Sequence, residues 1–301
     1  MSKVLLLYGG FSAEREVSIS SKNDISAALK SKNHEVIEHD LKDVWQLLEV
    51  IKTQKPDVVY NGLYGNWGED GELQGLLDML SIPYTHSGVK ASVLGMNKQL
   101  CKLIAEQNGV KTASGEATTY AKFLQNGTKL AFPYVIKPVS DGSSVGVFII
   151  NCEEDLKNVT YDDINTPILI ERFISGRELT AMCLNGKSYV VTELKPKTSF
   201  YDYKAKYTSG CTEHVLPADL PDEVTQTCLK YAEIMHKALG CNTVSRCDFR
   251  YNKDDGVVFL EINTAPGMTS LSLVPEQAKY VGISYADLCD ILVKNAECRR
   301  K

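Results

Sequence analysis

The first 90 residues alternate short apolar runs with segments of helical periodicity. The first apolar run ends at a pair of glycines, and a polar segment and a helical pattern follow it. We predict strands at residues 4–8, 34–39, 57–61 and 82–85, and helices at residues 21–30, 44–52 and 73–80. An apolar run bounded by turn residues indicates a buried strand. Strands that alternate with helices indicate βαβ units, so a parallel sheet is expected here.

The rest of the chain is richer in strands that are neighbours in the sequence. A long helical pattern covers residues 89–108 and ends before Gly109, which suits a helix C-terminus. We predict strands at residues 132–138, 145–150 and 167–173, hairpins at 178–194 and 244–263, and helices at 222–239 and 285–297. Three compact parts in series fit this order better than two.

Composition places the 301-residue chain among globular proteins. Hydrophobic residues make up 44% and charged residues 24%, which excludes a disordered chain or a coiled-coil rod. The formal charge is -5, and no Lys/Arg block provides the positive surface that nucleic acids or anionic membranes require. No segment has the apolar length of a membrane helix or a signal-peptide core. We therefore expect a cytoplasmic protein without a nucleic-acid or membrane partner.

The nine cysteines also indicate a cytoplasmic protein. Their number is odd, and they show neither CxxC nor Cys/His metal spacing. We expect them to be reduced and mostly buried as small hydrophobic side chains.

The second hairpin carries the most informative polar residues. Successive side chains of a strand point to opposite faces, so Arg246 shares a face with Asp248. Glu261 and Asn263 share a face in the same way. A two-residue turn at residues 254–255 would place Asp248 opposite Glu261, and it would place Arg246 opposite Asn263. The other face is expected to pack into a core and carries Cys247, Phe249, Leu260 and Ile262.

Two carboxylates that face each other across a hairpin repel each other, so positive charge should lie between them. Two interpretations remain open from these residues alone. Oxygen ligands without His or Cys favour Mg²⁺ or Mn²⁺ over zinc. Alternatively, Arg246 neutralises Asp248 on a hairpin that faces solvent.

Three loops add possible binding functions. Residues 139–146 place two glycines and three serines between two strands, where backbone N–H groups could surround phosphate oxygens. Residues 263–273 leave the carboxylate-bearing strand directly, so the N–H of Gly267 could point at a bound substrate. Residues 200–207 combine lysines with tyrosines. Each could also be a plain surface loop. Neither a P-loop nor a GxGxxG motif occurs, which argues against a P-loop NTPase and a simple dinucleotide-binding domain.

A set of ordered motifs along nearly the whole chain is more specific than any one loop. The motifs lie at residues 9–18, 68–74, 82–85, 141–146, 200–207, 246–248 and 261–275. Together they resemble the D-alanine–D-alanine ligases of the ATP-grasp superfamily. The resemblance implies an α/β fold, with an N-terminal parallel-sheet Rossmann-like domain at residues 1–95. Two ATP-grasp α+β domains would follow at residues 96–180 and 181–301, and homodimers are usual among the relatives.

The resemblance also implies the reaction and its substrates. ATP and D-alanine would form an acyl phosphate, and a second D-alanine would displace phosphate to give D-alanyl-D-alanine, a precursor of peptidoglycan. Two Mg²⁺ or Mn²⁺ ions would assist. D-serine or D-lactate as the second substrate remains an alternative, and so does a nucleotide-binding homologue that has lost catalysis.

The family's functional residues transfer to positions that match its motifs. The nucleotide-binding residues implied are Lys98, Lys137, Ser144, Glu171, Arg172, Ile174, Glu178 and Lys206. The metal ligands implied are Asp248, Glu261 and Asn263. The catalytic residues implied are Glu14, Ser143, Tyr207, Arg246 and Gly267. The residues implied for the second D-alanine are Ser272 and Leu273.

Three positions depart from the family pattern. Tyr64 stands where the family usually has an active-site His, and the nearby His86 is a possible replacement for the missing imidazole. Asp141 stands where Glu is more usual, which is a milder change. These departures concern substrate choice and pH dependence more than the class of reaction.

Overall fold

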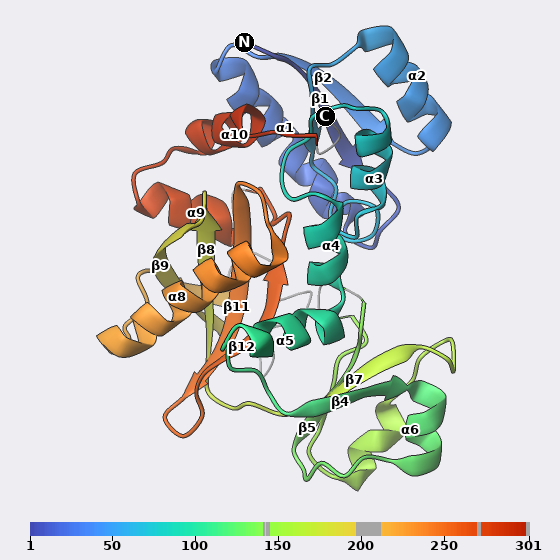
Figure 1. The fold of residues 1–301 in the computed structure, drawn as a ribbon, viewed down its shortest axis with the longest axis vertical. Helices are drawn as coiled ribbons and strands as arrows, with labels where there is room; N and C mark the ends of the chain where they lie inside the picture. Colours follow the sequence, from blue (N-terminus) through green and yellow to red (C-terminus); the bar gives the residue numbers. More distant parts are fainter. Residues whose placement is uncertain (141, 143–144, 197–211, 270–271, 299–301) are drawn as a thin grey trace.

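Three β-sheets follow one another along the long axis of the molecule (Figure 1). The computed structural model describes all residues except 141, 143–144, 197–211, 270–271 and 299–301. A three-stranded sheet lies at one end, a four-stranded sheet at the other, and a five-stranded sheet between them. The first sheet is parallel, and the other two are antiparallel. The predicted fold class is therefore confirmed.

The N-terminal sheet is built around a strand that is buried on both faces. Its elements are β1 (Lys3–Gly9), α1 (Arg15–Ser31), β2 (Glu35–Leu41), α2 (Val44–Gln54), β3 (Val58–Asn61) and α3 (Glu72–Met79). The strand order is β2-β1-β3. Leu5 and Leu7 pack with residues of α2 and α3, whereas Val4 and Leu6 pack with residues of α1. Burial on both faces explains why the first strand is continuously apolar.

The end of the chain returns to this first sheet. The last helix, α10 (Tyr285–Lys294), packs against α1, and the two lie close together in Figure 1. Beyond it, Glu297 exchanges two backbone hydrogen bonds with Tyr84, at 3.2 and 3.3 Å. Tyr84 also forms a parallel bridge with Val59. The strand predicted at residues 82–85 is thus reduced to a bridge that joins the first sheet to the end of the chain.

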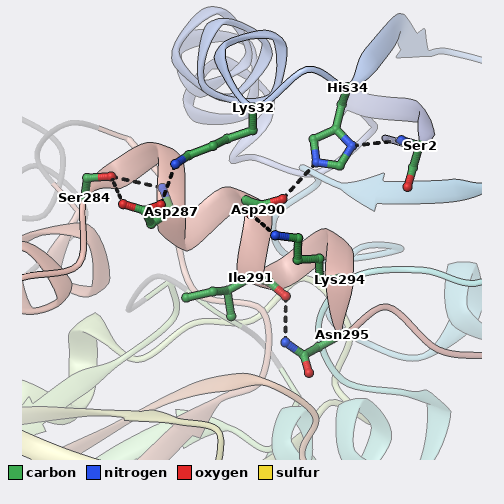
Figure 2. A network of polar contacts seen from close by, with 9 residues as sticks. All are labelled: Ser2, Lys32, His34, Ser284, Asp287, Asp290, Ile291, Lys294 and Asn295. Carbon is green, nitrogen blue, oxygen red and sulfur yellow. Dashed lines mark hydrogen bonds and ion pairs between the residues drawn. The ribbon is translucent and has the colours of Figure 1, made fainter.

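A polar network holds α10 against the segment that links α1 to β2 (Figure 2). His34 is buried, and its Nδ1 accepts a hydrogen bond from the backbone N–H of Ser2 at 3.2 Å. The proton of the neutral ring therefore lies on Nε2, which donates to Asp290 at 3.0 Å. Lys32 pairs with Asp287 at 2.5 Å. These contacts fix the position of α10 relative to the first sheet.

The predicted helix at residues 89–108 is two helices. They are α4 (Val89–Met96) and α5 (Lys98–Gln107). Asn97 between them has an extended backbone, and its side chain accepts a hydrogen bond from the N–H of Leu100 at 3.0 Å. A side chain that caps a helix start favours a new helix over continuation of the old one. The break places Lys98 in the first turn of α5.

The four-stranded sheet packs on one face over its own small core. Its elements are β4 (Gly115–Thr119), α6 (Tyr120–Asn126), β5 (Tyr134–Pro138), β6 (Phe148–Ile150), the 3-10 helix η1 (Glu153–Asn158) and β7 (Pro167–Arg172). The strand order is β4-β7-β5-β6. Ile136, Ile168 and Ile170 pack against Phe123 of α6. The three predicted strands are confirmed, whereas β4, α6 and η1 lacked a clear apolar periodicity and were missed.

The five-stranded sheet contains both predicted hairpins. Its strands are β8 (Arg177–Leu184), β9 (Lys187–Pro196), β10 (Thr212–Val215), β11 (Val244–Asn252) and β12 (Gly256–Asn263), in the order β10-β9-β8-β11-β12. The helices of this part are α8 (Asp222–Leu239) and α9 (Leu273–Tyr280). Helix α8 covers one face of the sheet (Figure 1), and α9 was not predicted. No helix in the described part of the chain combines the length and apolar character needed to cross a membrane.

The described cysteines are all free. Five of the eight are buried, as expected for small hydrophobic side chains: Cys101, Cys183, Cys228, Cys247 and Cys289.

We predict that Gly176, which links the four-stranded sheet to the five-stranded sheet, tolerates no side chain. Its φ is +107°, and a Cβ built there would overlap the carbonyl oxygen of Tyr251. Replacement by alanine should therefore lower the free energy of unfolding by at least about 3 kcal/mol, measured by urea denaturation. Gly109 is the matched control, because its φ is +72° and nothing lies within 4 Å of its added Cβ. Gly109→Ala should cost only about 1 kcal/mol, and equal losses would show that the overlap is relieved.

Candidate active site

The β11–β12 hairpin gathers the four polar residues that the sequence singled out. Asp248 pairs with Glu261, and Arg246 pairs with Asn263, as predicted. The turn, however, is longer than the two residues assumed, because Asn252 pairs with Gly256. A bulge compensates for the extra turn residue, because Asp248 pairs with Glu261 and Phe249 pairs with Phe259, which leaves Leu260 without a partner on β11. The predicted pairing is therefore confirmed, although the turn assumed for it is wrong.

The bulge changes which side chain of β12 faces the core. Leu260 was expected on the core face, but it lines a cleft together with Asp248 and Glu261. Phe259 takes its place, is 2% exposed, and packs against Phe249 with ring centroids 6.0 Å apart. The prediction for Leu260 was wrong because a bulge reverses the alternation of faces beyond it, and bulges of this kind are common beside active sites.

The cleft lies where the four-stranded and five-stranded sheets adjoin. It combines basic, acidic and apolar side chains from both sheets and from α5. Its predicted members are Lys98, Lys137, Glu171, Arg172, Ile174, Glu178, Asp248 and Glu261. Its other members are Ala113, Val135, Pro138, Gly142, Val145, Val147, Phe173, Arg250 and Leu260. The structure thus brings eight residues from distant parts of the sequence into one site.

A buried carboxylate between two lysines dominates one part of the cleft. Glu171 is 6% exposed and forms ion pairs with Lys102 through one oxygen and with Lys137 through the other. Burial alone would raise the pKa of Glu171, but the two ammonium groups outweigh it and hold the pKa below its usual value. Burial likewise opposes the charge of Lys137, and Glu171 outweighs it and raises the pKa of that lysine. Both groups are therefore charged at neutral pH.

Lys102 is a residue that the sequence interpretation missed. It also donates to the backbone carbonyl of Ala113 at 2.5 Å. A signal existed, because Lys102 lies one helical turn after Lys98 and so shares its helix face. The predicted helix at residues 89–108 already placed both lysines on one face, but a role was assigned only to Lys98.

The other predicted nucleotide residues differ in their contacts. Glu178 pairs with Arg250 at 3.0 Å within the cleft. Arg172 instead directs its guanidinium to the carboxylate of Asp255, at 2.5 and 3.2 Å. Ile174 is buried at the cleft wall.

The carboxylate part of the cleft is held by charge-assisted hydrogen bonds. Arg246 binds both oxygens of Asp248, at 3.0 and 2.8 Å, and Thr180 donates to the same carboxylate at 2.6 Å. Arg246 does neutralise Asp248, as one interpretation of the sequence held. The hairpin does not face open solvent, however, because Asp248 and Glu261 line the cleft.

The donor set fits a hard cation that shares its coordination with another molecule. Among the described residues, no group of three or more His, Cys, Asp or Glu side chains could hold a metal by itself. Asp248 and Glu261 provide carboxylate oxygens, and Asn263 provides an amide oxygen that also accepts from the N–H of Ala265 at 3.1 Å. Mg²⁺ commonly binds one or two carboxylates and completes its shell with phosphate and water oxygens.

Glu14 marks the opposite side of the site. It is 8% exposed, and a Cβ built on Gly65 would lie 2.8 Å from its Oε2. A Cβ on Gly142 would lie 3.7 Å from the same atom. The loop after β1, the loop after β3 and the loop after β5 therefore converge on this carboxylate.

Glu69 also lies in this region, although no role was assigned to it from the sequence. Burial raises its pKa well above the usual value, and the negative charge of Glu14 raises it further. Arg246 has the opposite effect on the same group. Glu69 is thus electrostatically coupled to both sides of the site. Its motif, residues 68–74, was the available signal.

The loop after β12 is tightly packed around Gly267. A Cβ on Gly267 would lie 3.0 Å from the hydroxyl of Ser272, which accepts a hydrogen bond from the N–H of Thr269 at 2.9 Å. Leu273 begins α9 and packs with Leu194. The predicted residues Ser143, Ser144, Lys206 and Tyr207, together with Asp141, lie outside the described residues.

His86 occupies a buried, apolar position. It is 2% exposed, its Nδ1 lies 3.0 Å from the hydroxyl of Thr85, and its ring meets the edge of Tyr60 at 5.8 Å between centroids. Its Nε2 has no hydrogen-bond partner among the described residues. Burial lowers the pKa of His86 to about 4. The imidazole is therefore neutral at physiological pH.

Two adjoining antiparallel sheets around a cleft with lysines and carboxylates define the ATP-grasp class of enzymes. The fold is similar to the crystal structure of D-alanine–D-alanine ligase from Bacillus anthracis complexed with ATP, with a TM-score of 0.82 and 31% identity over 97% of this chain and 96% of that one. It is also similar to the VanG D-Ala:D-Ser ligase from Enterococcus faecalis, with a TM-score of 0.80 and 25% identity over 97% and 98% of the two chains.

Sequence comparison narrows the class to one family. The family model described as D-ala D-ala ligase C-terminus matches residues 104–294. The D-alanine–D-alanine ligase of Erythrobacter litoralis is 46% identical over 302 residues, which cover 97% of this chain and 93% of that protein. The corresponding enzyme of Gluconobacter oxydans is 44% identical and covers 99% of this chain and 100% of that protein. The chain belongs to the D-alanine–D-alanine ligase family.

We predict that buried histidines destabilise the protein in acid. The pKa of His86 and that of His236 are both lowered to about 4 by burial, below the value of about 6.5 in the unfolded chain. The unfolded state therefore takes up protons first, and stability falls as the pH drops from 6.5 towards 4. Each residue should remove about 2 kcal/mol between pH 7.5 and pH 5.

Urea unfolding at the two pH values checks this prediction. His86→Gln should show a smaller acid-dependent loss than the unmodified protein, while His236 maintains the rest of the loss. An identical loss in both proteins would mean that His86 is not buried in its neutral form.

Proposed function

We propose that this protein joins two D-alanine molecules into D-alanyl-D-alanine with the hydrolysis of ATP to ADP and phosphate, for peptidoglycan precursor synthesis. The observation that carries the proposal is the convergence of three chemical groups on one site. Lysines, a buried glutamate and the hairpin carboxylates line one cleft, and Gly142 of that cleft lies beside Glu14. These are the groups that a nucleotide, its phosphates and an amino-acid ammonium group would need.

The nucleotide would lie between the two antiparallel sheets. Glu171 would accept from the adenine amino group, with its carboxylate oriented by Lys102. Lys98 and Lys137 would contact phosphate oxygens or the adenine edge, and Glu178 would accept from the ribose hydroxyls. Apolar side chains such as Ile174 and Leu260 provide flat contacts for a base. Lys206 and Ser144 are proposed as further phosphate ligands from the resemblance.

The first step is phosphoryl transfer to the carboxylate of the first D-alanine. An oxygen of that carboxylate forms a bond to the γ-phosphorus, and the bond from this phosphorus to the β–γ bridging oxygen of ATP breaks, giving ADP and an acyl phosphate. Glu14 would hold the ammonium group of this D-alanine, with Ser143 and Tyr207 proposed beside it. Catalysis of this step depends mainly on positioning and charge.

Asp248, Glu261 and Asn263 would hold the Mg²⁺ or Mn²⁺ ions. When bound, such ions neutralise the charge that develops on the transferring phosphoryl group. Arg246 already places one positive charge beside Asp248 and fixes the orientation of that carboxylate.

The second step is attack of the second D-alanine amine on the acyl carbon. A tetrahedral intermediate forms with negative charge on the former carbonyl oxygen, and its collapse releases phosphate. Arg246 and the N–H of Gly267 would stabilise this oxyanion, as preorganised donors do in other acyl transfers. Ser272 and Leu273 begin α9 and would receive the carboxylate of the second D-alanine at its N-terminus.

An assay of ADP release with and without D-alanine tests the proposed function. We expect release that requires D-alanine and Mg²⁺, with L-alanine inactive. D-serine and D-lactate as second substrates should react poorly, and a D-serine rate that matches the D-alanine rate would make the second substrate D-serine. Binding of ATP without turnover on any of these substrates would contradict ligase function.

We predict that Glu261 is indispensable whereas a carboxylate in the same hairpin is not. Glu261→Gln removes a charge that faces the cleft and should lower kcat by about a thousandfold or more. Asp254 is the matched control, because it lies exposed in the turn of the hairpin. Asp254→Asn should keep kcat within about twofold. Similar losses in the two variants would contradict the assignment of faces on β12.

A further inference from the structure

The residue that replaces the usual histidine has hydrogen bonds that link the two sides of the site. The hydroxyl of Tyr64 accepts a hydrogen bond from the backbone N–H of Met268 at 2.9 Å. It donates in turn to the hydroxyl of Ser21 on α1 at 3.1 Å, and Ser21 donates to the carbonyl of Ser18 at 3.0 Å. The direction of every bond in this chain is fixed, because a backbone N–H can only donate and a carbonyl can only accept.

A second tyrosine holds the next peptide group of the same loop. Tyr285 of α10 donates to the carbonyl oxygen of Met268 at 2.7 Å. The N–H of the same peptide group belongs to Thr269 and donates to Ser272 at 2.9 Å. Two successive peptide groups after Gly267 are therefore fixed by phenol groups, one from the N-terminal part and one from α10.

The backbone of Tyr64 is tied to the other side of the site. Ser12 donates to the carbonyl of Tyr64 at 2.6 Å, and the N–H of Glu14 donates to the hydroxyl of Ser12 at 3.1 Å. Tyr64 thus contacts the loop of Glu14 through its backbone and the loop of Gly267 through its side chain. A single buried residue therefore contacts both loops.

Burial keeps this contact intact under working conditions. Tyr64 is 4% exposed, and burial raises its pKa to about 12. The phenol is therefore protonated at neutral pH and can donate to Ser21 while it accepts from Met268. Removal of the hydroxyl would leave a buried N–H without a partner, which costs about 1–3 kcal/mol.

We propose that Tyr64, together with Tyr285, is a positioning residue that fixes the Gly267–Thr269 segment for the second, peptide-forming step. This inference rests on the proposed function and deepens it. Gly267 supplies the oxyanion donor, and Ser272 lies at the second D-alanine site. Displacement of the loop therefore weakens binding of the second D-alanine and slows the peptide-forming step. ATP binds at the other part of the cleft and is unaffected.

The test compares Tyr64→Phe with Tyr60→Phe. Tyr60 is fully buried beside the same tyrosines and donates to the sulfur of Cys289 at 3.9 Å, and among the described residues no hydrogen bond joins it to the loop. Tyr64→Phe should lower kcat/KM for the second D-alanine by about tenfold or more, because the reaction rate falls steeply when an oxyanion donor is misplaced. The Kd for Mg-ATP should stay within about twofold, and Tyr60→Phe should change both quantities by less than about twofold.

Hydrogen exchange at the backbone N–H of Met268 provides a readout that does not depend on activity. Exchange should be faster in Tyr64→Phe than in Tyr60→Phe. If Tyr64→Phe does not fold, Tyr285→Phe is tested in its place, with the same expected loss in kcat/KM for the second D-alanine and the same unchanged Kd for Mg-ATP. Unchanged exchange and kinetics, or equal kinetic losses in Tyr64→Phe and Tyr60→Phe, would overturn the proposal. Failure of the proposed function is distinguishable, because the unmodified protein would then show no D-alanine-dependent ADP release while Met268 exchange still reported on the contact.

Discussion

The opposition of Asp248 and Glu261 across one hairpin is the constraint on which the rest of the site depends. Two like charges at directly opposed positions destabilise a sheet, so the hairpin must be stabilised elsewhere. Its other face does this, since Phe249 and Phe259 are buried in the core beneath α8. Arg246 then fixes the orientation of Asp248. The charged pair can face the cleft because the apolar face and the arginine compensate for the repulsion.

The site takes parts from all three sheets, and shared cores explain how these parts keep their relative positions. Val4 and Tyr60 of the first sheet pack in one cluster with Met268, Val274 and residues of α10. A second cluster joins α4 and α5 to the five-stranded sheet. The four-stranded sheet has its own core and meets the others at the cleft. The part of the site proposed for acyl transfer is therefore built on the larger continuous core, and the part proposed for the nucleotide lies where a separate core adjoins it.

The sequence predicted most strands and helices and the residue types of the site, but it missed β4, α6 and α9 and predicted irregular backbone poorly. Alternation correctly paired Asp248 with Glu261, but it misplaced Leu260, because a bulge depends on the whole sheet and not on local pattern. Lys102 was missed because its significance depends on the ion pair with Glu171, which lies 69 positions further along the chain. Tyr64 was recognised as unusual, yet its contact with Met268 joins residues more than 200 positions apart. No local pattern can specify such a contact.

The return of α10 and Glu297 to the first sheet also has a consequence for synthesis on the ribosome. One face of α1 and the edge beside Tyr84 are covered by segments that lie more than 200 positions further along the chain. The N-terminal sheet can form early, but part of its apolar surface must wait until α10 leaves the exit tunnel. Domains generally fold in order as they emerge, so part of the apolar surface of the first sheet stays uncovered while the two antiparallel sheets are synthesised.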